Sequence, residues 1–511
     1  MKVKLILPAL TEATSPFFRP VKYSLFPPLG LATLAASLSE RDEVVLEDEH
    51  VQRLDLDDRP DLVAIEVYIT AARRAYAIAD HYRRRGAWVV LGGLHVTSLP
   101  NEAAAHADTV CLGPSEDTWP ELLADFASGR PRPLYRARVA GYAGPSPRRD
   151  LIDRRRYLVP SSLVVSRGCP HTCDFCYTTS FFAGGRRHAT RAVDRALAEV
   201  ESLPGRHLYF LDDNLFGDPD FALALCHGLE GMGRLWQAAG TVAAIHRRGL
   251  MERAARAGLS SLFVGFETLD PSSLARHRKV PNLGADYDAA VRRLHDLGVM
   301  VNASFVFGMD EHDESVFERT VEWAISSGVE TATFHVLTPS PGTPLFRRLE
   351  AEGRLLHRDW DLYDTRHSVF RPRRMTPEAL EAGYWWAYRE FYRWGSILNG
   401  ARAHQDLAGS LRHLALAVAW KKVEPLWNVL VAARRLADAR PLLEALLAAG
   451  GSGARAESAN PAWLAQLREG LTPEMSTVPS DFDESGSSAV GVSRRDGARA
   501  TWSHEPSGRR A

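Results

Sequence analysis

Three cysteines lie within eight positions of the chain, at Cys169, Cys173 and Cys176. Their spacing is C-x3-C-x2-C, and Gly168 just before them allows the backbone to turn tightly. Cysteine thiolates hold iron–sulfur clusters, and three of them leave one iron of a [4Fe–4S] cube open to an outside ligand. Zinc is the alternative metal, with His171 as a poorly spaced fourth ligand. Three unliganded cysteines are the remaining alternative.

The composition of the whole chain excludes several other classes of protein. The chain has 511 residues, of which 45% are hydrophobic and 24% charged, and its net charge is -1. This is a globular mixture, and the balanced charge argues against sequence-independent binding to nucleic acid. The apolar runs are too short to span a bilayer, so we expect no transmembrane segment. Five cysteines in so long a chain do not form a disulfide framework.

Strand-like and helix-like stretches alternate through residues 1–135. The predicted strands are Lys2–Leu7, Glu43–Leu46, Leu62–Tyr68, Ala87–Leu91 and Thr109–Leu112, and the predicted helices are Leu31–Ser39, Ala71–Arg85 and Thr118–Phe126. Such repeats predict an α/β fold with a doubly wound, Rossmann-like parallel sheet and helices on its faces. Ligands of these sheets bind at the C-terminal ends of the strands.

A second alternating stretch, residues 159–345, follows a linker rich in Pro and Gly at 136–158. Its predicted strands are Ser161–Ser166, His207–Leu211, Ala238–Val242, Ser261–Phe266, Met300–Phe307 and Thr331–Leu337. Six such units predict a partial (β/α)6 barrel, two units short of the full eight. Residues 346–448 are predicted to be a helical C-terminal segment, and residues 449–511 a disordered tail.

The predicted C-terminal helices raise two questions. Pro377–Tyr392 is dense in aromatic residues, which suit either core packing or the wall of a substrate site. His404–Leu447 predicts one or two amphipathic helices, with Pro425 and Pro441 as breakers. Its apolar run Leu414–Trp420 fits a packed helix better than a contact with a membrane or a partner.

The cysteine motif resembles that of the radical S-adenosylmethionine (radical SAM) superfamily. An aromatic residue, Phe175, precedes the last cysteine, and a predicted strand precedes the first. The resemblance covers about residues 155–345. It implies that Cys169, Cys173 and Cys176 hold a [4Fe–4S] cluster whose open iron binds S-adenosylmethionine (SAM), and that Phe175 packs near the adenine.

Polar residues at later strand ends support this resemblance. Asp212 and Asp213 follow the second predicted strand, where the family faces the amino group of SAM; a turn or helix cap is their alternative use. The resemblance places Glu267 beside the ribose and Ser304 near the adenine. Residues 337–344 resemble the sixth strand end of one subgroup.

The N-terminal sheet carries a second resemblance. Segments Gly92–Thr97 and Phe26–Leu31 resemble the cobalamin-binding domain that precedes many radical SAM barrels. The cobalamin-binding residues that this implies are Gly30, Thr70, Gly92, Gly93, His95, Thr97 and Glu116. The usual motif for a histidine ligand to cobalt is missing, because Arg53 replaces its glycine after His50. A domain that kept its shape but lost cobalamin is the alternative.

Together the two resemblances imply a cobalamin-dependent radical SAM enzyme. The reaction expected first is methylation of an unactivated carbon, through a 5'-deoxyadenosyl radical and methylcobalamin. A radical SAM cyclase or rearrangement enzyme is the alternative within the family, and a cobalamin or redox sensor is the alternative from another class. The sequence identifies no catalytic side chain, because His246, His335 and His367 are isolated and better explained as structural.

The resemblance also implies partners and a location. The expected electron donor is a flavodoxin- or ferredoxin-type reductant. Aromatic residues after position 345 favour a large or apolar small-molecule substrate, such as a lipid or natural-product intermediate. An oxygen-labile cluster with an open iron favours a reducing cytoplasm. The sequence does not identify the substrate or the oligomeric state.

Overall fold

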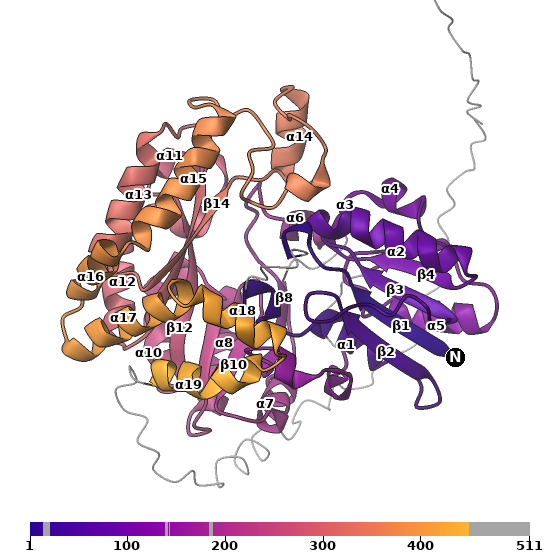
Figure 1. The fold of residues 1–511 in the computed structure, drawn as a ribbon. Helices are drawn as coiled ribbons and strands as arrows, with labels where there is room; N and C mark the ends of the chain where they lie inside the picture. Colours follow the sequence, from indigo (N-terminus) through magenta and orange to yellow (C-terminus); the bar gives the residue numbers. More distant parts are fainter. Residues whose placement is uncertain (14–20, 138–141, 143, 183–187, 449–511) are drawn as a thin grey trace, which may run out of the picture. The chain divides into compact units, whose positions relative to one another are not determined.

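The computed structural model describes residues 1–13, 21–137, 142, 144–182 and 188–448. The tail predicted at 449–511 lies outside these residues. The described part contains two six-stranded parallel sheets, each with helices packed on it (Figure 1). The α/β fold class predicted from the alternating strands and helices is confirmed.

The first sheet is built from the N-terminal strands. They are β1 (Lys2–Leu7), β2 (Glu43–Asp48), β3 (Leu62–Glu66), β4 (Trp88–Gly92), β5 (Thr109–Leu112) and β6 (Leu134–Arg136). The helices are α1 (Leu29–Ala35), α2 (Ala72–Arg84), α3 (Leu94–Ser98), α4 (Pro100–Ala104) and α5 (Trp119–Ala127). The strand order β2-β1-β3-β4-β5-β6 is that of a doubly wound sheet. Its central strands are apolar because helices cover both faces.

Strand β6 was not predicted. Its three residues pair in parallel with β5, from Val110 opposite Leu134 to Leu112 opposite Arg136. The strand is short and lies directly after Pro131 and Pro133, so the sequence around it resembles a linker. The sheet therefore runs to the first residue of the predicted linker.

The second sheet contains all six strands predicted for the barrel. They are β7 (Ser162–Leu163), β10 (His207–Phe210), β11 (Leu235–Gly240), β12 (Leu259–Glu267), β13 (Met300–Phe307) and β14 (Thr331–Val336). Their order is β14-β13-β12-β11-β10-β7, and every pairing is parallel. The expected first strand is divided: β8 (Ser166–Gly168) leaves the sheet and pairs antiparallel with β9 (His188–Thr190).

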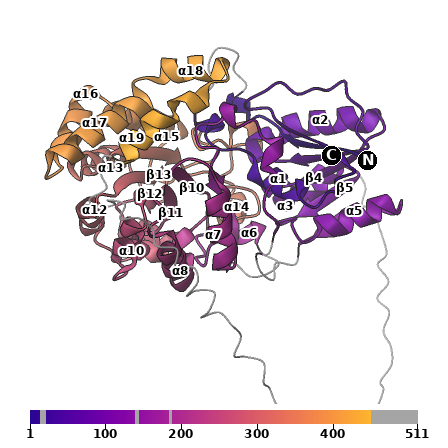
Figure 2. The same cartoon turned by 90° about the horizontal axis from the view of Figure 1, so that it is seen from below.

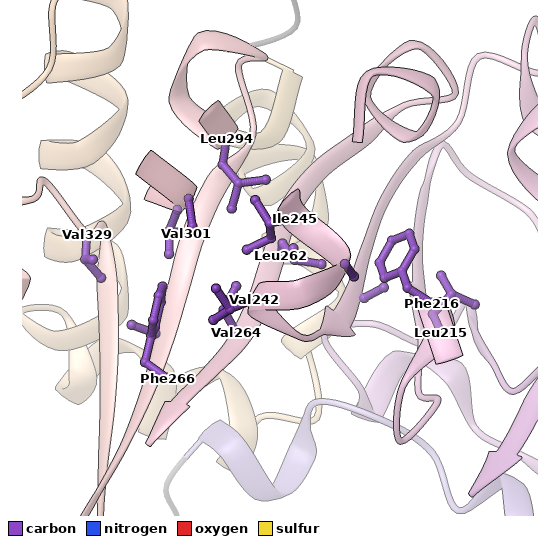
Figure 3. Close-up of a cluster of buried hydrophobic side chains, with 14 of the residues drawn as sticks. Leu215, Phe216, Val242, Ile245, Leu262, Val264, Phe266, Leu294, Val301 and Val329 are labelled. Atoms are coloured by element: carbon purple, nitrogen blue, oxygen red, sulfur yellow. The ribbon is translucent and has the colours of Figure 1, made fainter. Parts of the chain in front are cut away.

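Helices line this sheet along its length (Figure 2). They are α7 (Val193–Ser202), α8 (Pro219–Leu229), α9 (Val242–His246), α10 (Leu250–Arg256), α11 (Pro271–Arg276), α12 (Tyr287–Asp296) and α13 (Ser315–Ser326). The short helix α6 (Thr178–Phe181) instead contacts α3 of the first sheet. Figure 3 shows the core between them, where Val242 and Ile245 of α9 lie near Leu262 and Val264 of β12. Each such side chain contributes about 1.5–3 kcal/mol by leaving water.

The C-terminal helices number more than predicted. They are α14 (Pro344–Ala351), α15 (Pro377–Phe391), α16 (Trp394–Arg402), α17 (Leu407–Lys421), α18 (Glu424–Ala432) and α19 (Arg440–Ala448). The stretch expected to hold one or two helices holds α17, α18 and α19. Pro425 and Pro441 lie in the first turns of α18 and α19, where the missing N–H costs nothing.

The aromatic residues of α15 mainly serve the core. Tyr384, Phe391 and Tyr392 are buried, whereas Trp385 is 48% exposed. The hydroxyl of Tyr392 both donates to the carbonyl and accepts from the N–H of Ala332 on β14. Because β14 is an edge strand of its sheet, this hydroxyl satisfies backbone groups that have no strand partner there.

Helix α14 and the segment after it pack on the first sheet. Phe346, Trp360, Tyr363 and Val369 share a buried cluster with side chains of α2, β3 and β4. The indole of Trp360 also donates to Glu102 on α4, at 3.1 Å. In the described part of the chain, no helix is long and apolar enough to cross a membrane.

Candidate cofactor sites

The three cysteines lie on the loop between β8 and α6. All three are free, and burial raises the pKa of each thiol, to about 12 for Cys173. A buried thiolate therefore needs a cation to stabilise it, as a metal centre does. Three thiols on one short loop are the ligand set of a [4Fe–4S] cluster with one open iron, whereas a structural zinc ion takes four protein ligands.

Two aspartates fix the backbone that leads into this loop. Asp212 accepts from the N–H groups of Val165 and Ser166, and Asp213 accepts from the N–H of Gly168 at 2.9 Å. Asp213 also accepts from the hydroxyl of Tyr177, the residue after the last cysteine. Both carboxylates were predicted to face the amino group of SAM. The structure places them against the cysteine loop itself, so each acts on its shape.

The neighbouring Asn214 has an oxygen without a partner. Its amide nitrogen lies 3.8 Å from the sulfur of Cys169, and its side chain is buried. Its oxygen Oδ1 has no hydrogen-bond partner among the described residues. A buried acceptor of this kind needs a donor, and the ammonium of an amino acid would supply one. The segment was predicted to matter, but Asn214 was not chosen as a site residue.

A buried ion pair lies at the C-terminal end of β12. Glu267 has a positive φ of 66°, which is rare for a residue with a side chain, and it pairs with Lys279. Burial lowers the pKa of Lys279, but the charges of Glu267 and Cys173 together raise it by more. The pKa therefore lies above its usual value, and the ammonium stays charged. A side chain at Gly265 would meet both groups, at 2.6 Å and 3.0 Å. Glu267 was predicted as a site residue and Lys279 was not.

Two further predicted residues lie near this ion pair. Ser304 on β13 stands opposite Gly265 in the strand register and is 6% exposed. Phe175 has its ring 5.8 Å from the ring of His277, which bonds through Nδ1 to Asp174 at 2.7 Å. The structure therefore brings Ser304 and Glu267 to one end of the sheet, and holds Phe175 by a neighbour that the sequence did not reveal.

A glycine-lined pocket opens at the C-terminal ends of β3, β4 and β5. Four predicted cobalamin residues line it, namely Gly30, Gly92, Gly93 and Glu116. Gly93 has a φ of 105°, and a side chain there would lie 3.0 Å from the backbone of Val67. A flat or extended ligand can therefore approach the backbone closely. Arg167 and Phe181, which flank the cysteine loop, complete the wall.

Three other predicted residues do not line this pocket. His95 is buried and bonds through Nε2 to Glu102, away from the glycines. Thr97 donates to the carbonyl of Gly93 and accepts from the N–H of Gly113. Thr70 is buried, and its carbonyl accepts from the hydroxyl of Thr11. These contacts shape the strand ends, and a direct role of the three residues in binding cobalamin stays a prediction.

One arginine connects the pocket to the cysteine loop. Arg167 on β8 pairs with Glu116, which follows β5, and its guanidinium lies 5.2 Å from the centre of the Tyr142 ring. It also interacts with the carboxylate of Glu66 at the end of β3, whose pKa is raised by burial. Sequence patterns missed Arg167, although it stands two residues before the first cysteine.

Two aromatic rings stand exposed beside these residues. Tyr68 follows β3 and is 39% exposed, and Tyr177 follows Cys176 and is 38% exposed. Their phenols lie close enough to interact electrostatically. Apolar rings that stay partly open between a pocket and a metal loop offer a surface for a substrate. No sequence pattern indicates this pairing, because the two residues are far apart along the chain.

Comparisons with known proteins agree with this architecture. Residues 163–324 match the Radical SAM superfamily, and residues 21–123 match the B12 binding domain. The bacteriochlorophyllide d C-12(1)-methyltransferase of Chlorobaculum tepidum is 30% identical over 391 residues, which are 73% of this chain and 84% of that protein. The hopanoid C-2 methylase of Rhodopseudomonas palustris is 27% identical and covers 66% of each chain.

Solved structures share the fold. TsrM from Kitasatospora setae, a radical SAM methyltransferase with cobalamin and a [4Fe–4S] cluster bound, aligns with a TM-score of 0.55 at 17% identity. The alignment covers 85% of this chain and 99% of that one. The cobalamin-dependent radical enzyme OxsB aligns with a TM-score of 0.59 over 85% of this chain and 72% of that one, at 13% identity. With both domain matches and the relative at 30% identity, the chain belongs to the cobalamin-dependent radical SAM methyltransferase family.

Proposed function

We propose that this enzyme methylates an unactivated carbon of a large, mainly apolar substrate. The observation that supports this most is the shared wall of the glycine-lined pocket and the cysteine loop, formed by Arg167 and Phe181. A carbon held there would lie near both cofactors of the family. Such proximity replaces an improbable encounter of three molecules with a fixed arrangement.

The cofactors supply the difficult chemistry when bound. The cluster and one SAM molecule provide a radical that removes a hydrogen atom, and cobalamin delivers a methyl group that comes from a second SAM molecule. The protein positions these groups and keeps water away from them. The residues described above fit that task. The three thiols lie on one loop, and the glycines, which have no side chains, leave space in the pocket.

Charged and polar side chains would orient SAM at the open iron. Asn214 offers an unpartnered oxygen to the SAM ammonium beside Cys169. Lys279 offers a positive charge, suited to the carboxylate, while Glu267 offers an acceptor for ribose hydroxyls. Asp212 and Asp213 hold the cysteine loop in shape during this binding.

The substrate class follows from the relatives and from two exposed rings. The relatives at 30% and 27% identity are named for bacteriochlorophyllide d and hopanoid substrates, which are large and mostly apolar. The partly exposed rings of Tyr68 and Tyr177 would give such a substrate an apolar face to lie on. A flavodoxin- or ferredoxin-type protein would supply the two electrons that each turnover needs.

An anaerobic assay with SAM, cobalamin and a low-potential reductant tests this proposal. A tetrapyrrole and a triterpenoid would each be offered as substrate. We expect a mass gain of one CH2, with one S-adenosylhomocysteine and one 5'-deoxyadenosine for each methylated molecule. Cys173→Ser should form neither nucleoside product, whereas Cys226→Ala, a buried cysteine on α8, should form both.

Other outcomes would separate the alternatives. A cyclase or rearrangement enzyme would release 5'-deoxyadenosine without S-adenosylhomocysteine and without a mass gain. A cobalamin or redox sensor would release neither product. Either result, obtained with a substrate that the enzyme demonstrably binds, would replace the methylation proposal.

A further inference from the structure

A cluster of histidines and a glutamate lies at the other end of the barrel sheet. His295 near the end of α12, Glu330 just before β14 and His404 between α16 and α17 bring ligand atoms within 4.8 Å of one another. Glu330 precedes its strand and accepts from the N–H of Val301 near the start of β13. The cluster therefore lies at the N-terminal strand ends, whereas Glu267 marks the C-terminal ends.

The carboxylate of Glu330 is the most unusual part of this cluster. Its side chain is fully buried and accepts from the N–H of Val301. Val301 and the preceding residue Val329 belong to the apolar core drawn in Figure 3. The oxygen Oε1 has no hydrogen-bond partner among the described residues, and no Lys or Arg in that part of the chain forms an ion pair with Glu330. A buried carboxylate whose only ionic contacts within the described chain are long ones to histidines is costly, and a cation bound here would offset that cost.

The distances fit ligands of one metal ion better than hydrogen bonds. His295 Nε2 lies 3.4 Å from Oε2 of Glu330, and His404 Nε2 lies 3.9 Å from Oε1. Two ligand atoms, each about 2.1 Å from a tetrahedral zinc ion, lie about 3.4 Å apart. The imidazoles and the carboxylate are thus arranged around a space of roughly the right size.

A further histidine contacts the proposed ligands. His413 on α17 is buried, and its Nδ1 lies 3.2 Å from Nε2 of His404, the same nitrogen that faces Glu330, so metal binding would replace this contact.

We propose that His295, Glu330 and His404 bind one divalent transition metal ion, Zn2+ by preference, that clamps the C-terminal helices to the base of the barrel. The site faces a surface cavity lined by polar residues including Asp288, Asp296 and Asp406, so a metal ion can enter from solvent. Two imidazoles and a carboxylate are a common zinc set. The ion would tie the chain between α16 and α17 to α12 and to the start of β14. This role is separate from the iron–sulfur cluster and from the proposed methylation.

Zinc titration of the full-length protein with its cluster reconstituted tests the proposal. Zn2+ would be added against a chromogenic chelator, with zinc per chain measured by elemental analysis. We expect one tightly bound zinc ion and a higher midpoint of thermal unfolding when zinc is present. His404→Gln should weaken binding on the order of 100-fold and remove the rise in the midpoint. His106→Gln, a histidine at the surface of the first sheet's helices, should change neither.

Two further measurements distinguish zinc bound at this site from zinc bound by the three cysteines. The triple variant with Ala at Cys169, Cys173 and Cys176 should still bind one zinc ion, because the proposed ligands contain no sulfur. Co2+ bound to that variant should give a visible spectrum of low-coordinate cobalt. If His404→Gln does not fold, His295→Gln provides the same comparison. The proposal is wrong if wild type binds no zinc, if zinc is lost with the cysteines, or if a folded histidine variant binds as tightly as wild type.

Discussion

Lys279 and Glu267 form a charged pair beside the cysteine loop. Burial raises the pKa of the thiols of Cys169 and Cys173, and the positive charge of Lys279 acts against that rise. We expect Lys279→Met to weaken SAM binding at least about tenfold, or about 1.4 kcal/mol, because it removes the positive charge beside the cluster. Equilibrium dialysis with labelled SAM would measure this.

The partner residue separates binding from folding. Removing Lys279 alone leaves the carboxylate of Glu267 buried and unpaired, which costs about 3 kcal/mol of stability. The double variant Lys279→Met/Glu267→Gln should recover most of that stability, while SAM binding stays weak. If the single variant binds SAM as wild type does, the pair supports only the fold.

The carboxyl group of Asp212 should make stability depend on pH. Burial raises the pKa of Asp212 to about 7, against hydrogen bonds from Ser166 and Val165 that lower it. The folded protein therefore binds a proton that the unfolded chain has released between about pH 4 and pH 7. The free energy of unfolding should fall as pH rises through that window, by up to about 4 kcal/mol, and level off above it.

The variant Asp212→Asn tests this dependence. The asparagine oxygen can still accept from the backbone N–H groups of Val165 and Ser166, but it does not titrate. Urea unfolding of both proteins between pH 5.5 and pH 8, under exclusion of oxygen, should show the slope in wild type and a smaller slope in the variant. Equal slopes would mean that Asp212 is ionised throughout.

The residues of the candidate site differ in how far sequence could predict them. The cysteines were found because ligands of one cluster share one short loop, which leaves a spacing in the sequence. Lys279 and Arg167 do not belong to a motif with a fixed spacing, so no local sequence pattern identifies them. Arg167 meets Glu116, which lies 51 positions away, only because β8 and the end of β5 come together in the fold. Contacts between distant segments have no local pattern.

At the scale of elements, the lack of a side chain at Gly265 leaves room for the ion pair of Glu267 and Lys279 at the end of β12. An alanine Cβ there would lie 2.6 Å from an oxygen of Glu267 and 3.0 Å from the ammonium of Lys279. We expect Gly265→Ala to displace the pair, weaken SAM binding about tenfold and cost about 1–3 kcal/mol of stability. Dialysis with SAM and thermal unfolding would measure the two effects.

Gly395 on α16 offers a matched control. A side chain there would meet no atom closer than 3.9 Å, so Gly395→Ala should leave SAM binding unchanged. Because alanine favours a helix over glycine, it should stabilise the protein by up to about 1 kcal/mol. Unchanged SAM binding in Gly265→Ala would show that the strand end adapts to the extra carbon.

The elements were predicted well wherever apolar runs were long. The six barrel strands and the first five strands of the other sheet stood out because buried parallel strands are continuously apolar. The errors at β6 and in the last helices arose because proline was interpreted as the end of an element. Pro425 and Pro441 begin helices, and Pro133 directly precedes β6, so in each case proline marks a start.

At the scale of the whole molecule, polar contacts and a returning segment connect the first sheet to the barrel. Residues 346–369 pack on α2 and its strands after leaving the barrel, which no pattern in their sequence indicates. Arg167 and Glu116 form the polar contact nearest to the cysteine loop. The pair therefore lies where the two proposed cofactors must be aligned.

Breaking that pair should uncouple radical formation from methylation. In Glu116→Gln the charge that holds Arg167 is lost, while the cysteines, Asn214 and Lys279 are untouched, so SAM cleavage should continue. The methyl donor would be held less firmly against the substrate, because Glu116 and Arg167 share the wall of the glycine-lined pocket. We expect 5'-deoxyadenosine per methylated product to rise severalfold, measured by chromatography of both products from one reaction. An unchanged ratio with both rates lowered equally would instead mean that the pair only stabilises the fold, since misalignment must affect the second step more than the first.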